Sequence, residues 1–494
     1  MKTTRQRRFR RRLLACVLTS LTLLGTSADA APLDALARRY RFTPDVIGSI
    51  LFDPAQGTVV ESHLADTARI PASTTKIVVG LAALHLLGPE YRFTTALLRD
   101  GPVQDGSLHG DLYLRGGGDP SLSSDALRHF VAALKKAGIR RMVGRFLFDD
   151  SFLPSTSAIN ARQPTAAAYN PGVSALSLNY NRIQLQWRHT VGRPDFRISV
   201  WSPADSGNLP LRAIQTGVQA PGLDRRMKFL HSAPQLDRWL LSRSLPPQGW
   251  QTLPIRTDPG RVAALIFRTL CDTHGIQLPL PQPGLAPGDA QPVYTHASPA
   301  LSQLVADTLR YSSNLSAELI GQVASRYLTG RPLTIRESAT ALTAWYRQQL
   351  PDIDWRAFDS RNHSGLSSRS RHTPRQLAAI LRHGWRPSTD RATTFDFAAL
   401  LPDVQRRSPP AHDRVHVRAK SGTMHYAGGL AGYVRTRRGR RLGFVILLTD
   451  FARRTALDAA FDSRIDSTPA PARAWTRRAK RFERALIRDW QERY

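Results

Sequence analysis

The sequence predicts an α+β protein in which a long, mostly β segment interrupts a mixed core. Runs of residues typical of strands occur near both ends of the chain, and runs with helical spacing accompany them. The stretch from about residue 91 to residue 290 instead contains short strand-like runs, many prolines and glycine-rich turns. With 494 residues, the chain is long enough for two to three domains or for one core with a large insertion.

The folded part of the chain is predicted to begin with two strands and a helix. The strands cover residues 46–52 and 58–63, and a Pro-Ala-Gln-Gly turn joins them. The helix covers residues 74–87 and ends at Gly88-Pro89. In the predicted insertion, residues 111–114 form a strand and residues 124–137 a helix.

The second half of the chain returns to longer elements. Helices are predicted at residues 299–309 and 315–328, and strands at 415–419, 430–436 and 442–449. The last two strands form a hairpin around Arg438-Gly439. After the linker Pro469-Ala470-Pro471, a final amphipathic helix repeats apolar residues on one face, at Trp475, Ala479, Phe482, Leu486 and Trp490. We expect this face to pack on the last strands; binding to a membrane surface is the alternative.

The N-terminus is predicted to be a cleaved export signal. Residues 1–30 combine seven basic residues, an apolar run at residues 13–24 and the small-x-small site Ala28-Asp29-Ala30. Lipidation at Cys16 is disfavoured because Arg11 and Arg12 lie too close to it. Cleavage leaves Cys271 as the one cysteine, so no internal disulfide can form, and a buried position in a helix is expected for it.

The charge indicates polyanionic surroundings. The chain has 69 basic and 38 acidic residues, a net charge of +31. The basic residues are spread along the chain, and no nucleic-acid-binding motif accompanies them. Together with the export signal, this favours anionic envelope polymers or lipid head groups as partners and argues against nucleic acid. The expected location is the periplasm or cell envelope, with peripheral contact to the membrane as one alternative.

Lysines are scarce in this chain, which makes each one a candidate for a specific role. Only seven of the 69 basic residues are lysines, and only a lysine can lose its proton in a desolvated site and act as a base. Lys76 lies three residues after Ser73 at the predicted helix start, which places both side chains on one helical face. This spacing predicts that Lys76 activates the Ser73 hydroxyl as a nucleophile; a simple helix cap is the alternative.

Two further motifs follow in the chain. Lys420-Ser421-Gly422-Thr423 comes after the strand predicted at 415–419, and its ammonium and hydroxyl groups suit a carboxylate, while Gly422 permits close approach of a substrate backbone. Ser312-Ser313-Asn314 directly precedes a predicted helix. The Ser-x-Asn pattern recurs elsewhere, but Ser-x-x-Lys and Lys-[Ser/Thr]-Gly each occur once. The three motifs in this order are therefore a specific signal.

These motifs resemble the penicillin-binding protein and serine β-lactamase superfamily, and in particular the D-alanyl-D-alanine carboxypeptidase/endopeptidase family typified by penicillin-binding protein 4. Residues 110–122, 175–179 and 363–367 extend the resemblance over nearly the whole mature chain. It implies a penicillin-binding transpeptidase core, an antiparallel sheet flanked by helices. The implied division is a signal peptide at 1–30, core at 31–90, inserted domain or domains at 91–290 and core at 291–494.

The resemblance also implies the reaction and the roles of the site residues. The substrates are peptidoglycan stem peptides or their cross-links, and β-lactams are covalent inhibitors. Ser73 is the acylated nucleophile, Lys76 its base and Ser312 a proton relay to the leaving amine. The expected substrate-binding residues are Asn314, Lys420, Ser421, Gly422 and Thr423. Asn362-His363 departs from the family's usual Asp-Gly before Ser-Gly-Leu, so this loop is left outside the predicted site.

Other functions fit the sequence less well. A β-lactamase must deacylate quickly, in one class through a Glu-x-x-x-Asn loop, and neither Glu318 nor Glu337 has Asn four residues later. The Tyr-x-Asn of another class is also missing, since Ser312 stands there. The Gly-x-Ser-x-Gly elbow typical of Ser-His-Asp hydrolases does not occur. The histidines show no His-Glu-x-x-His metal pattern, and neither a metal nor another cofactor is expected. A non-catalytic, polymer-binding protein with a vestigial fold is the remaining alternative. The balance of carboxypeptidase and endopeptidase activity, the third stem-peptide residue and the oligomeric state stay undetermined.

Overall fold

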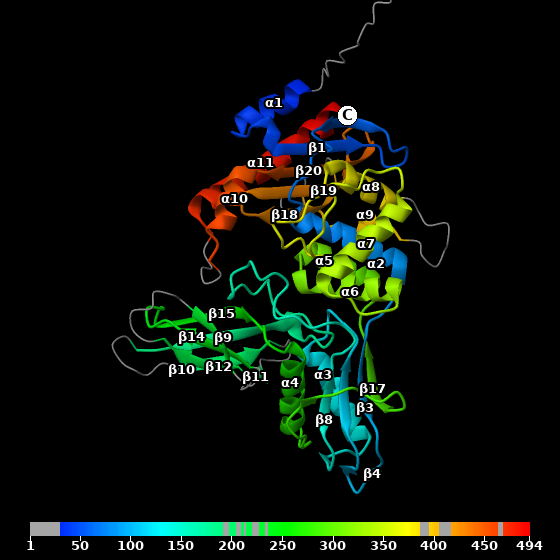
Figure 1. Ribbon diagram of the computed structural model, residues 1–494, viewed down its shortest axis with the longest axis vertical. Coiled ribbons are helices and arrows are strands. Elements are labelled where there is room, and N and C mark those ends of the chain that lie inside the picture. The colour runs from blue at the N-terminus through cyan, green and yellow to red at the C-terminus, as the bar shows by residue number, and fades with distance from the viewer. Residues whose placement is uncertain are drawn as a thin grey trace, which may run out of the picture.

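The computed structural model describes residues 30–190, 197–203, 209–211, 214–219, 227–232, 236–385, 395–404, 416–462 and 468–494. The predicted signal peptide therefore lies outside the described residues, except for Ala30. In Figure 1 an upper, layered part of helices and one sheet stands on a lower, mostly β part, from which an arm projects sideways. No helix in these ranges is both long enough and apolar enough to span a bilayer.

A five-stranded antiparallel sheet joins the two ends of the chain. Its order is β18-β19-β20-β1-β2, which places the C-terminal hairpin beside the first strand. The strands are β1 (Ile47–Phe52), β2 (Val59–His63), β18 (Val417–Met424), β19 (Ala427–Arg435) and β20 (Arg441–Thr449). The predicted α+β class, the opening strand pair and the closing hairpin are confirmed.

Helices cover both faces of this sheet. On one face, α2 (Thr75–Leu87) and α8 (Pro374–Trp385) pack with α5 (Leu301–Tyr311), α6 (Asn314–Thr329) and α7 (Ile335–Gln349) in one apolar core. On the other, α11 (Ala470–Arg493) and α1 (Ala30–Arg39) form a second core with the sheet. The strands separate the two cores because successive side chains point to opposite faces.

The C-terminal helix uses its apolar face inside the protein. Trp475, Phe482 and Trp490 are buried against the sheet, so packing on the last strands is confirmed and the membrane-binding alternative for this face is wrong. The helix also starts earlier than predicted. It begins at Ala470 and includes Pro471, because proline in a first turn lacks only an N–H that has no helical partner there.

The lower part is built mainly from strands. One sheet has the order β16-β8-β6-β3-β17, and α3 (Ser124–Lys136) and α4 (Pro259–Thr273) pack in the core beside it. Its strands are β3 (Thr94–Arg99), β6 (Leu112–Gly116), β8 (Phe146–Asp149), β16 (Gln282–Pro283) and β17 (Gln291–Ala297). β3 and β17 pair, so the chain enters and leaves this part side by side. Cys271 is buried, as expected.

The arm consists of two further sheets in the part of the chain around residues 182–254. The four-stranded sheet has the order β11-β10-β9-β15, and the three-stranded sheet has the order β12-β14-β13 (Figure 1). Their strands are β9 (Arg182–Arg188), β10 (Arg197–Ser202), β11 (Leu209–Pro210), β12 (Gln215–Val218), β13 (Met227–Ser232), β14 (Leu236–Leu241) and β15 (Gln248–Pro254).

The end of the strand that carries the lysine motif was predicted wrongly. The lysine motif was placed after a strand at 415–419, whereas β18 continues to Met424 and Lys420 pairs with Ala431 of β19. Gly422 and the facing Gly429 lower the intrinsic strand preference of this segment, but pairing with β19 supplies the hydrogen bonds that hold it extended. The motif therefore lies on a sheet edge.

Candidate active site

Ser73 lies in a short turn that leads into α2. The turn is a 3-10 helix, Ala72–Thr74, and α2 follows from Thr75. The hydroxyls of Thr74 and Thr75 donate to the carbonyls of Pro71 and Ala72, which closes the turn. The Ser73 side chain is only partly buried and faces a cleft, while Lys76, one turn on, is almost fully buried. Their separation along the helix brings Lys76 Nζ to 3.2 Å from Ser73 Oγ.

The surroundings of Lys76 favour its neutral form. Burial moves the pKa of Lys76 well below its usual value, and the charge of Lys420 acts in the same direction. Besides Ser73, the amine contacts Asn314 Oδ1 and the Ser364 carbonyl oxygen, both at 2.7 Å. These two acceptors fix the position of the nitrogen and leave its lone pair available to the serine hydroxyl. The arrangement suits a general base.

The edge strand β18 forms the opposite wall. A Cβ added to Gly422 would lie 2.7 Å from the Pro71 carbonyl oxygen and 3.1 Å from Ser73 N, so only glycine permits this approach. Lys420 is buried on the same side of the strand, and burial lowers its pKa to about 8. Thr423 lines the cleft beside Ser73, whereas Ser421 is exposed on β18 and is not among the residues that line the cleft.

Ser312 and Asn314 lie where α5 ends and α6 begins. Ser312 adopts a left-handed backbone conformation with φ 57°, which turns the chain sharply between the two helices, and it lines the cleft. Asn314 is the first residue of α6, and its Nδ2 donates to the Tyr169 carbonyl at 2.8 Å while Oδ1 accepts from Lys76. The amide thus connects the predicted base to the segment that contains Tyr169.

The loop at residues 362–366 was left out of the predicted site, yet it contacts the nucleophile turn. The Ser364 carbonyl holds Lys76, and Asn362 Oδ1 accepts from the N–H groups of Gly365 and Leu366. Gly365 has φ +76°, and a Cβ there would lie 1.8 Å from the Ala72 carbonyl oxygen. The sequence signal for this loop was Ser364-Gly365-Leu366, which matches the family; the loop was left out because Asn362-His363 precedes it in place of Asp-Gly.

Glu318 is a second residue that the sequence did not assign. Its carboxylate is completely buried on α6 and accepts from the backbone N–H groups of His363 and Ser364 at 3.0 and 2.9 Å. Burial raises the pKa of Glu318, and the Ser364 side chain, the two N–H groups and Lys76 offset part of that rise. Glu318 in turn raises the pKa of Lys76 and holds the loop that positions it.

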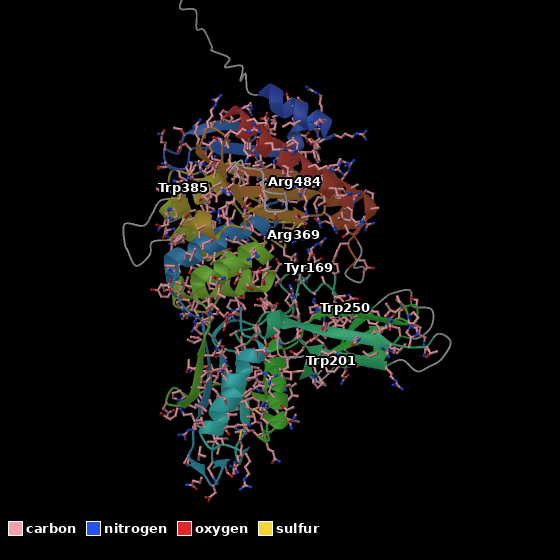
Figure 2. All side chains as sticks on the ribbon, turned by 180° about the vertical axis from the view of Figure 1, so that it is seen from behind. Tyr169, Trp201, Trp250, Arg369, Trp385 and Arg484 are labelled. Carbon is pink, nitrogen blue, oxygen red and sulfur yellow. The ribbon has the colours of Figure 1, made fainter. Side chains whose placement is uncertain are left out.

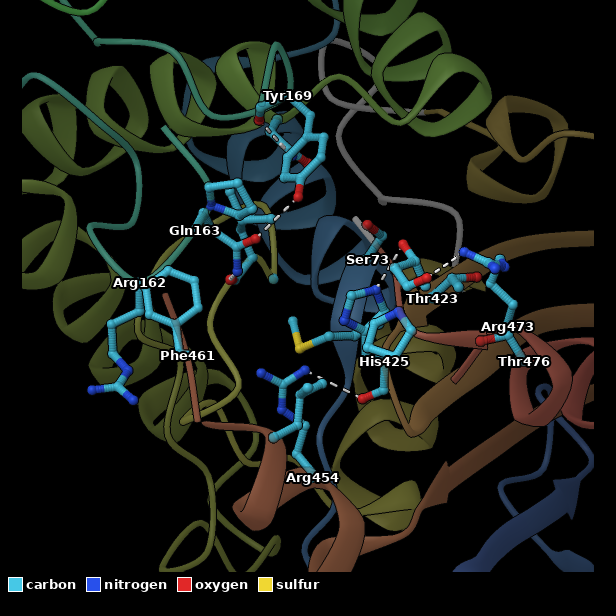
Figure 3. A pocket seen from close by; sticks show the side chains of 18 of the residues that line it. Ser73, Arg162, Gln163, Tyr169, Thr423, His425, Arg454, Phe461, Arg473 and Thr476 are labelled. Carbon is cyan, nitrogen blue, oxygen red and sulfur yellow. Dashed lines mark hydrogen bonds between the residues drawn. The ribbon is translucent and has the colours of Figure 1, made fainter. Parts of the chain in front are cut away.

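The cleft extends well beyond the nucleophile. Its volume is about 780 Å³, and Figure 3 shows Ser73 and Thr423 at one side, with Tyr169 and Gln163 from the insertion across from them. The Tyr169 hydroxyl donates to Gln163 Oε1. Arg454, whose side chain contacts the His425 carbonyl, and the start of α11 close the remaining wall. Residues 162–169 therefore share one cleft with Ser73, Thr423 and the C-terminal helices.

Comparisons with known proteins agree with this arrangement. The sequence model of the D-Ala-D-Ala carboxypeptidase 3 (S13) family matches residues 30–466. The chain is similar to D-alanyl-D-alanine carboxypeptidase DacB of Haemophilus influenzae, with 25% identity over 82% of this chain and 86% of the relative. It is also similar to a D-alanyl-D-alanine carboxypeptidase of Actinomadura sp. strain R39, with 26% identity over 85% and 83%.

The fold is similar to that of a solved structure. The crystal structure of penicillin binding protein 4 (dacB) from Haemophilus influenzae superposes with a TM-score of 0.74 and 21% identity, covering 93% of this chain and 99% of that chain. The match spans both the layered part and the insertion. Because the family model matches most of its length, the chain belongs to the D-Ala-D-Ala carboxypeptidase 3 (S13) family of serine hydrolases.

Proposed function

We propose that the protein is a serine-type D-alanyl-D-alanine carboxypeptidase and endopeptidase that cleaves peptidoglycan stem peptides or their cross-links through an acyl-enzyme on Ser73. The observation that carries this proposal is the position of Lys76 Nζ, 3.2 Å from Ser73 Oγ at the edge of a large cleft. Burial lowers the pKa of this amine and so favours its neutral form. The carboxypeptidase relatives support the substrate class.

In the proposed reaction, Lys76 Nζ takes the proton of Ser73 as Oγ attacks the carbonyl carbon of the scissile bond. The backbone N–H groups of Ser73 and Thr423 donate to the oxyanion that forms. Collapse of this intermediate breaks the C–N bond, and Ser312 passes a proton to the departing amine. Water then attacks the ester, which releases the shortened peptide and restores Ser73. Lys420 and Thr423 hold the terminal carboxylate.

Two assays on the purified protein test this function. Incubation with a stem peptide that ends in D-Ala-D-Ala is expected to release D-alanine, and pretreatment with penicillin is expected to block the release. Peptide mapping by mass spectrometry should then locate the penicillin adduct on the peptide that contains Ser73. D-alanine release at the normal rate from fully labelled protein, or an adduct on another peptide, would contradict the proposal.

Substrate binding is expected to weaken above about pH 8. Only the protonated form of Lys420 attracts a carboxylate, and the pKa of Lys420 in the free protein is about 8. KM for a peptide with a free terminal carboxylate should therefore rise about tenfold per pH unit above that value, as for any essential protonated group. The matched control is the same peptide with a C-terminal amide. Equal pH dependence of KM for both peptides would remove Lys420 from carboxylate binding.

The location is proposed to be the cell envelope, with residues 1–30 removed on export. The mature protein is expected to begin at Ala31, which N-terminal sequencing of protein from the envelope fraction can check. Recovery of intact Met1 there would contradict this prediction.

The proposed organisation of the mature protein is a core (31–90 and 291–494) with an insertion (91–290). A solvent-facing basic row on α11 supports contact with anionic envelope polymers or a membrane surface: Arg477, Lys480, Arg481, Arg484 and Arg488.

A further inference from the structure

The four-stranded sheet of the arm has one buried and one exposed face. On β9, Ile183, Leu185 and Trp187 are buried in the core of the lower part. The residues between them, Gln184 and Gln186, point the other way because side chains alternate along a strand. Gln186 is exposed and Gln184 is half-buried, and among the described residues neither glutamine side chain has a hydrogen-bond partner.

Two tryptophans belong to this exposed face. Trp201 of β10 pairs with Gln184 of β9, and Trp250 of β15 pairs with Gln186. Residues directly opposite in neighbouring strands point to the same face, so indole rings flank the glutamine row from both sides. Figure 2 shows both tryptophans on the arm. Trp250 is 66% exposed, although burying such a ring would favour folding.

The charges of this face have one sign. β9, β10 and β15 contain no acidic residue, and Arg188 pairs with Arg197 across the sheet at its outer end. A second copy of the same face would bring two positively charged faces together in a two-fold symmetric dimer. Repulsion between like charges therefore disfavours self-association through this face.

The face begins beside the catalytic cleft. Arg182, the first residue of β9, donates from Nε to the Ala168 carbonyl at 3.0 Å. The next residue, Tyr169, lines the cleft, and its own carbonyl accepts from Asn314. From Arg182 the seven residues of β9 extend the face outward by about 20 Å, at ~3.3 Å per residue. A polymer that carries the substrate peptide into the cleft can continue along this face.

We propose that the exposed face of β9, β10 and β15 binds the glycan strand of peptidoglycan; this inference rests on the proposed function. Pyranose rings have apolar C–H faces that pack on indole rings, and this face offers the exposed Trp250 and the half-buried Trp201. The acetamido groups of the amino sugars match the donors and acceptors of Gln184 and Gln186. Arg188 supplies further donors to hydroxyl and carbonyl oxygens.

The first experiment measures binding to peptide-free glycan strands, released from peptidoglycan by an amidase. The wild-type protein is expected to bind them, and Trp250→Ala should raise Kd at least ~10-fold, the scale of a buried aromatic anchor. The matched control is Tyr327→Ala, which removes an equally exposed aromatic ring from α6. No binding by the wild type, or equal Kd for wild type and Trp250→Ala, would overturn the proposal.

A second measurement compares two substrates. The ratio of D-alanine release from intact peptidoglycan to release from a short stem peptide should fall at least ~5-fold in Trp250→Ala, because only the polymer reaches the arm. An unchanged ratio would count against the glycan face. Conversion of a dimer to a monomer by Trp250→Ala, with unchanged glycan binding, would assign the face to self-association instead. Penicillin labelling of the wild type tests the proposed function separately.

Discussion

Lys76→Arg is expected to slow penicillin acylation at least ~100-fold, the scale on which general-base catalysis contributes. Burial lowers the pKa of Lys76, so its amine can be neutral at working pH, whereas a guanidinium stays protonated and cannot accept the Ser73 proton. The broader group also cannot reproduce the contacts of Nζ with Asn314 and Ser364. Time-resolved mass spectrometry of the intact protein measures the rate directly.

Ser73→Ala is expected to abolish the adduct, because no other hydroxyl occupies the nucleophile position. The double variant of Ser73 and Lys76 should be no worse, since residues that act as one unit are not additive. Lys480→Arg, on the exposed side of α11, serves as the matched lysine control and should acylate normally. Unchanged acylation of Lys76→Arg, or an adduct that persists in Ser73→Ala, would refute the mechanism.

Glu318→Ala is expected to lower the free energy of unfolding by about 2–6 kcal/mol, since each buried donor left without an acceptor costs about 1–3 kcal/mol. The change leaves the N–H groups of His363 and Ser364 without acceptors in a buried site. It also removes the carboxylate that raises the pKa of Lys76 next to a second buried lysine, Lys420. Urea denaturation measures the loss.

Glu318→Gln separates the charge from the packing. Loss of the negative charge lowers the pKa of Lys76 further, so the acid limb of the acylation rate should move to lower pH; Lys420 of β18 continues to act in the same direction. The matched control is Glu337→Gln at the exposed start of α7, where the glutamine amide oxygen can still accept from Thr334 N–H, so neither stability nor the pH profile should change appreciably. An unshifted acid limb in Glu318→Gln would show that Glu318 does not tune the base.

Local features of the site were predictable from the sequence. Ser73 and Lys76 needed only helical spacing, and the rarity of lysine singled out Lys76 and Lys420. The strand–strand–helix opening and the closing hairpin follow from turn residues and apolar runs, which act over a few positions. The apolar face of α11 also predicted its packing. Each of these depends on interactions between residues that are near in sequence.

Tertiary structure alone decided what surrounds the base. Asn314 and Ser364 reach Lys76 across 238 and 288 residues of chain, and Glu318 holds the loop that carries Ser364. Such contacts depend on how β1 joins the C-terminal hairpin and how α2 packs on α6, which no local pattern encodes. β18 likewise extends past Ala419 because pairing with β19, rather than its own residue preferences, supplies its hydrogen bonds.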